Sequence, residues 1–123
     1  MLEFRYLTTI PEFLALDATW FNGELYVAGK WGLGPLVADR RNYAPLLRLS
    51  LSGALAPVWP WSNGYLEADT RRQCEAEGVT ALALWQGDLW ASGQRWTAEG
   101  YEYKLSRYDG RTWLDAVTSA SWR

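Results

Sequence analysis

Residues 20–31 read WFNGELYVAGKW, and residues 85–96 read WQGDLWASGQRW. From Asn22 to Gly29 the first stretch aligns with the second at a constant offset of 64 residues; Gly, Leu and Gly are identical, and most other positions are closely similar. Each stretch holds a dipeptide that ends in glycine, Asn22-Gly23 or Gln86-Gly87. Such dipeptides are typical of tight hairpin turns, because glycine adopts a positive φ at little cost. The sequence therefore predicts two copies of one β-hairpin repeat.

A second hairpin follows each copy. Apolar and polar residues alternate over 47–51 and again over 101–106, and each run leads to a turn, Ser52-Gly53 or Asp109-Gly110. Alternation with a period of two indicates strands with one buried face. The predicted fold is all-β, with two antiparallel four-stranded units.

These units divide a single β domain that covers residues 1–123. Unit 1 is expected over residues 13–58 and unit 2 over 79–121, with an inserted loop at 59–78 between them. Residues 3–9 are a candidate for one further strand. In each unit the strand after the first turn is expected to end at Gly29 or Gly93, where the missing side chain permits a bulge or a close backbone approach.

Composition restricts the class of protein. The chain is 49% hydrophobic and 21% charged, which is typical of a globular domain. The net charge of −2 comes without a basic cluster, so no nucleic-acid partner is expected. No apolar run is long enough to span a membrane, and the N-terminus does not resemble a signal peptide. We expect a soluble protein, located in the cytoplasm or in a particle assembled there.

Catalytic chemistry is poorly represented. With no histidine and a single cysteine, the chain lacks the usual triads and imidazole or thiolate metal sites. Paired carboxylates could serve a glycosidase, but the spacing of Asp39, Glu99 and Glu102 does not favour catalysis over solvation. We expect no enzyme activity, no metal and no cofactor.

The two units resemble the β-propeller blade repeats of the kelch and delta-60 type. In unit 1 the matching residues are Asn22-Gly23, Leu25-Tyr26-Val27-Ala28-Gly29, Arg48-Leu49 and Gly53. In unit 2 they are Gly87, Leu89-Trp90-Ala91-Ser92-Gly93, Arg107-Tyr108-Asp109-Gly110 and Trp113. The resemblance implies blade architecture and carries no function, because this fold serves many.

Two blades do not close a propeller, which has four to eight. The resemblance implies a partial β-propeller that is completed by oligomerisation, with three chains giving six blades, or by other partners. An open or sandwich-like β domain packed against a partner is the alternative.

Trp31 and Trp96 follow Gly29 and Gly93 and are expected on corresponding loops of the two units. One interpretation makes each indole a plug between neighbouring blades. The other makes them a repeated aromatic platform for a glycan, with Arg95 and Glu99 supplying hydrogen bonds.

Trp59 and Trp61 flank Pro60 and would point to one face of an extended segment. Exposed, this pair would form a protein–protein contact or a ligand clamp; buried, it would cover the core. Both possibilities stay open from the sequence.

These observations predict a non-catalytic structural or interaction module that assembles with copies of itself or with other proteins, as a component of a large assembly such as a phage particle. The alternative is a carbohydrate-binding lectin with one aromatic site in each blade. The sequence identifies neither the ligand nor the partner.

Overall fold

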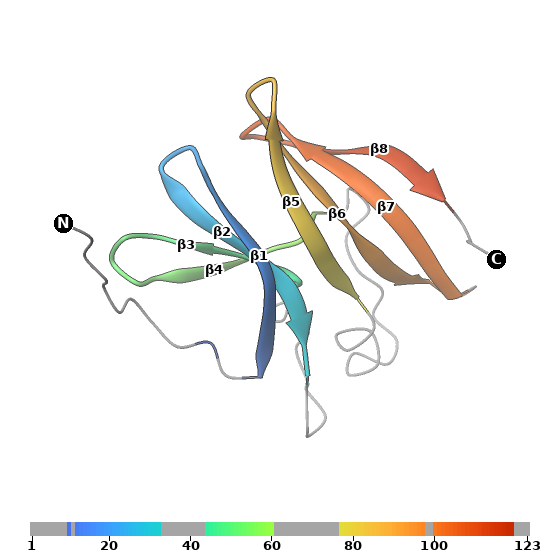
Figure 1. Ribbon diagram of the computed structural model, residues 1–123, viewed down its shortest axis with the longest axis horizontal. Coiled ribbons are helices and arrows are strands. Elements are labelled where there is room, and N and C mark those ends of the chain that lie inside the picture. Colours follow the sequence, from blue (N-terminus) through green and yellow to red (C-terminus); the bar gives the residue numbers. More distant parts are fainter. Residues whose placement is uncertain (1–9, 11, 33–43, 61–76, 98–99, 120–123) are drawn as a thin grey trace.

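The computed structural model describes residue 10 and residues 12–32, 44–60, 77–97 and 100–119. Within these ranges the chain is all-β and antiparallel (Figure 1). The strands are β1 (Phe13–Phe21), β2 (Glu24–Trp31), β3 (Leu46–Leu49), β4 (Leu55–Val58), β5 (Gly78–Trp85), β6 (Asp88–Thr97), β7 (Gly100–Tyr108) and β8 (Trp113–Ser119).

Each predicted unit is a four-stranded antiparallel meander. In unit 1, β1 pairs with β2, β2 with β3, and β3 with β4. In unit 2, β5 to β8 pair in the same consecutive order. The eight strands lie at the predicted places. The additional strand considered at residues 3–9 falls outside the described residues.

The first hairpin of each unit has the predicted turn. Asn22 and Gly23 have φ values of 51° and 80°, and Gln86 and Gly87 have nearly the same values, 52° and 84°. Positive φ at both central residues defines the turn geometry that matches the twist of a two-residue hairpin.

Gly29 and Gly93, which are equivalent in the repeat, each lie opposite a β-bulge on the neighbouring strand. The register shifts between Ala15 and Asp17 in β1, and between Val79 and Ala81 in β5. A side chain on Gly29 would overlap the carbonyl oxygen of Leu14. The close backbone approach that the sequence predicted is therefore present in unit 1.

Gly93 stands in the same relation to the carbonyl oxygen of Gly78 in unit 2. The strands do not end at these glycines, however. β2 continues to Trp31, which pairs with Phe13, and β6 continues to Thr97, which pairs with Gly100.

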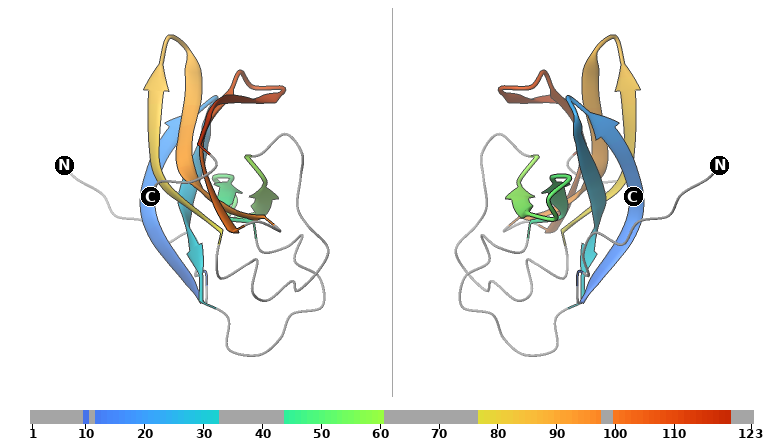
Figure 2. Two further views of the ribbon diagram at one scale, coloured as in Figure 1. Left: turned by 90° about the vertical axis from the view of Figure 1, so that its right-hand side faces the viewer. Right: turned by 90° about the vertical axis from the view of Figure 1, so that its left-hand side faces the viewer.

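The two units form one continuous sheet, in the order β4-β3-β2-β5-β6-β7-β8, with β1 also paired to β2. A single residue pair, Lys30 with Gly78, joins β2 to β5. The sheet curls strongly, so that the structure has the form of a half-barrel when it is seen from the side (Figure 2). Curling lets one unit pack its face against the other.

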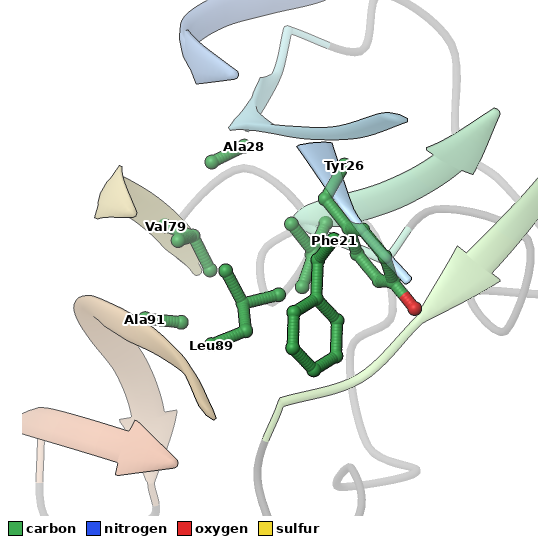
Figure 3. Close-up of a cluster of buried hydrophobic side chains, with 7 residues drawn as sticks. Phe21, Tyr26, Ala28, Val79, Leu89 and Ala91 are labelled. Carbon is green, nitrogen blue, oxygen red and sulfur yellow. The ribbon is translucent and has the colours of Figure 1, made fainter. Parts of the chain in front are cut away.

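The main hydrophobic core lies between the units (Figure 3). Its buried residues are Phe21, Tyr26, Ala28 and Leu46 from unit 1, and Val79, Leu89 and Ala91 from unit 2. A polar contact adds to this interface, since the Asp17 carboxylate accepts a hydrogen bond from the Leu82 backbone N–H at 2.8 Å. The units therefore share one core, as expected for repeats that cannot bury their faces alone.

Candidate interaction surface

Trp31 is a core residue of unit 1. Its side chain is buried against Phe13 and Leu47, with the Phe13 ring centroid 4.9 Å away. The indole Nε1 donates a hydrogen bond to the Ala44 carbonyl oxygen at 2.8 Å. Trp31 lies in a strand, where a loop was expected, and its buried ring presents no face on which a sugar could stack.

Arg95, and not Trp96, is the counterpart of Trp31 at the 64-residue offset. The Arg95 side chain is also buried, at 5% exposure, and its Nη1 has no hydrogen-bond partner within the described part of the chain. Glu102 lies opposite Arg95 in the β6–β7 register and forms an ion pair with buried Lys104 at 3.7 Å. Arg95, Glu102 and Lys104 therefore lie on the same face of the β6–β7 ladder.

The structure describes only some of the other predicted site residues. Trp59 is half-buried and packs against the main core. Trp61, Glu99 and the side chain of Trp96 lie outside the described residues. The glycan site of Trp96, Arg95 and Glu99 accordingly stays a prediction.

The exposed large hydrophobic side chains were not singled out from the sequence. Ten large hydrophobic side chains are exposed in the described part of the chain: Leu14, Leu16, Trp20, Leu51, Leu55, Leu84, Trp85, Tyr101, Tyr103 and Leu114. Single exposed apolar residues are ordinary, but indoles at 51% and 60% exposure, as in Trp20 and Trp85, are typical of contact surfaces.

One face of unit 2 gathers such residues into an ordered group. Trp85 of β5 and Trp90 of β6 meet edge to face, with ring centroids 5.9 Å apart. The Arg107 guanidinium lies 5.9 Å from the centroid of the Trp90 ring, and its Nε is 3.7 Å from an Asp88 carboxylate oxygen. We call this surface of Trp85, Asp88, Trp90 and Arg107 the front face of unit 2.

Trp90 carries an unusual polar atom on this face. Its Nε1 is buried and has no hydrogen-bond partner within the described residues. A buried donor without an acceptor is costly and uncommon in a finished structure. The front face of unit 2 therefore has both an exposed indole and an unsatisfied donor.

Unit 1 carries the same group on its own front face, made of Phe21, Glu24, Tyr26 and Arg48. Phe21 and Tyr26 meet edge to face at 5.9 Å, and the Arg48 Nε lies 3.5 Å from a Glu24 carboxylate oxygen. Here unit 2 covers the two aromatic rings, whereas the Arg48 and Glu24 side chains are 39% and 40% exposed. Burial raises the pKa of the Tyr26 phenol above its ordinary value of 10.0, although the hydrogen bond with Arg48 acts in the opposite direction.

Replacing Tyr26 by phenylalanine should lessen the loss of stability at alkaline pH. Because the pKa of Tyr26 is raised by folding, its contribution to stability is complete below about pH 10 and is lost as the pH rises through the raised value. The free energy of unfolding of the wild-type protein should therefore fall more steeply above about pH 10 than that of Tyr26→Phe. Urea denaturation across this range measures both slopes.

The exposed Tyr103 provides the control, because Tyr103→Phe removes a phenolic hydroxyl outside the core. Its stability should follow the wild-type curve. Equal slopes for the wild type and Tyr26→Phe would show that the phenol of Tyr26 ionises as readily in the folded chain as in the unfolded one.

Comparisons with known proteins identify no relative. No protein-family model, curated protein or solved structure significantly matches the chain. Within the described ranges, the acidic side chains form no group of three or more that could hold a metal ion. No helix among the described residues is long and apolar enough to cross a membrane.

Proposed function

We propose that this protein is a non-catalytic structural module that assembles with copies of itself or with other proteins. The observation that carries the proposal is the ordered aromatic group on the front face of unit 2, with Trp85 at 60% exposure. Exposed indoles that are held by neighbouring side chains are typical of protein contact surfaces, since Trp and Arg contribute most of the binding energy there.

The repeat architecture supports the same proposal. A unit buries its front face only when another unit covers it, as unit 2 covers Phe21 and Tyr26 of unit 1. In the described part of the chain, the counterpart residue Trp85 of unit 2 has no such cover. Three chains would supply the six units of a closed ring, and a large particle such as a virion would supply other protein partners.

The test is the mass of the purified protein in solution. Analytical ultracentrifugation over a wide range of concentration should show oligomers whose population rises with concentration. The proposal would be contradicted if the protein stayed monomeric at every concentration and no protein partner could be isolated with it from its native source.

A lectin is the second candidate, and the exposed face of Trp85 beside Asp88 and Arg107 supports it. An indole face can stack on the apolar side of a sugar ring, while a carboxylate and a guanidinium bind hydroxyl groups. Binding to a glycan array that Trp85→Ala abolishes would favour this candidate. Assembly that is insensitive to every glycan tested would favour the structural role.

A further inference from the structure

The 64-residue repeat extends to the details of the front faces. At this offset Phe21 corresponds to Trp85, Glu24 to Asp88 and Tyr26 to Trp90. Arg48 and Arg107 also correspond, because they lie opposite Tyr26 and Trp90 in the β2–β3 and β6–β7 registers. Both groups contain an edge-to-face aromatic pair with centroids 5.9 Å apart and an arginine–carboxylate ion pair. The two front faces are thus built alike.

The aromatic residues of the two faces differ sharply in burial, whereas the Arg48 and Arg107 side chains are about equally exposed, at 39% and 42%. Phe21 is 6% exposed and its counterpart Trp85 is 60% exposed. The cover over Phe21 and Tyr26 is the opposite face of unit 2, which we call the back face and which carries Val79, Leu89 and Tyr108. Within the chain, then, the front face of one unit packs on the back face of the next.

The back face of unit 1 repeats the chemistry of this cover. At the same offset Val79 corresponds to Ala15, and Leu89 to Leu25. Tyr108 corresponds to Leu49, because these two lie opposite Leu89 and Leu25 in matching registers. All the counterparts are apolar.

Part of the back face of unit 1 is open to solvent. Ala15 and Ala18 of β1 are exposed, and Leu55 of β4 is 40% exposed, whereas Leu49 on the same face is already buried. Leu55 is the counterpart of Trp113, which packs beside the internal interface and stacks on Tyr108 at 4.8 Å. One chain therefore has an open front face on unit 2 and a back face on unit 1 that is at least partly open.

We propose that these two faces bind each other between copies of this chain, so that the front face of unit 2 docks on the back face of unit 1 of a second copy. This inference rests on the proposed function and specifies its surface and its partner. A contact of this kind is heterologous, because the two copies contribute different faces. It builds a ring when the rotation between copies closes and a filament when it does not.

The experiment uses one variant for each face. Trp85→Lys places a charge on the front face of unit 2, and Ala18→Lys places one on the back face of unit 1. Both positions are exposed, so the folded chain should tolerate them. Leu55→Lys is a second back-face variant in case Ala18→Lys fails to fold. The matched control is Leu51→Lys, which lies in the exposed β3–β4 turn outside both faces.

Each face variant alone should stop at the monomer in analytical ultracentrifugation, with a rise of about ten-fold or more in the dissociation constant. An equal mixture of the two should form dimers with one copy of each, because one intact front and one intact back remain. Labelling one variant with a heavy isotope and recording native mass spectra would identify this pair. Leu51→Lys should assemble like the wild type.

The possible failures are distinguishable. If the wild type assembles and both face variants assemble equally well, the interface is wrong and the proposed function stands. If the front-face variant alone abolishes assembly, the contact joins two front faces and the head-to-tail arrangement is wrong. A wild-type protein that is monomeric at all concentrations overturns the self-assembly on which this inference depends.

Discussion

Replacing Gly29 or Gly93 by alanine is expected to destabilise the protein severely. A Cβ on Gly29 would overlap the Leu14 carbonyl oxygen and lie 2.7 Å from the Phe13 ring. A Cβ on Gly93 would overlap the Gly78 carbonyl oxygen and lie 2.9 Å from the Val79 Cα. The obstructing backbone belongs to paired strands and can shift only by disrupting the bulge and its ladder. We expect each variant to lose about 3 kcal/mol or more.

The loss is large for a domain of this size, whose total stability is on the order of 5–15 kcal/mol. Urea denaturation followed by tryptophan fluorescence measures it. Gly32→Ala is the matched control, because a Cβ at Gly32 meets nothing within 4 Å. Gly29→Ala and Gly93→Ala variants as stable as Gly32→Ala would show that the strands do not approach as closely as described.

Truncating Leu89 should have the second largest effect. Leu89 is fully buried in the core between the units, and it lies opposite Leu84 in the β5–β6 register. Leu89→Ala removes apolar contacts from both units and leaves a cavity, at a cost of about 2–5 kcal/mol. Thermal or urea unfolding should show a single transition at lower stability, because both units share this core.

Leu84→Ala makes the same chemical change on the directly opposite residue, which is 53% exposed. Its cost should be well below that of Leu89→Ala, since much of the Leu84 side chain is already in water. Similar losses for the two variants would contradict the placement of the core between the units.

Local signals in the sequence predicted the fold well. The turn dipeptides at Asn22 and Gln86 act through backbone conformation, which depends on a few adjacent residues. The glycines Gly29 and Gly93 leave room for the close approach of the paired strand. The strands and the four-stranded character of each unit followed from alternation and from the repeat. The extension of β2 to Trp31 did not, because it depends on pairing with a distant residue, Phe13.

The candidate site was harder to predict. Phe21 and Trp85 occupy equivalent hairpins with closely similar neighbours, but one is buried and the other is exposed. Only the position of the next unit along the sheet makes this difference, and no local pattern records it. For the same reason Trp31, which resembles a platform residue in sequence, is part of the core. The repeat itself held the useful signal, since it shows which residues of the two units are equivalent.

A proline in a terminal strand limits the ways in which this sheet can grow. β4 is the last strand of the sheet in the described part of the chain, and Pro57 lies within it, opposite Leu47. Because proline has no N–H, the outer side of β4 offers a gap where a further strand would need a donor. Natural sheets use this device against amyloid-like, edge-to-edge aggregation. A chain protected in this way can carry adhesive faces at high concentration without extending its hydrogen-bond ladder into a fibril at this edge.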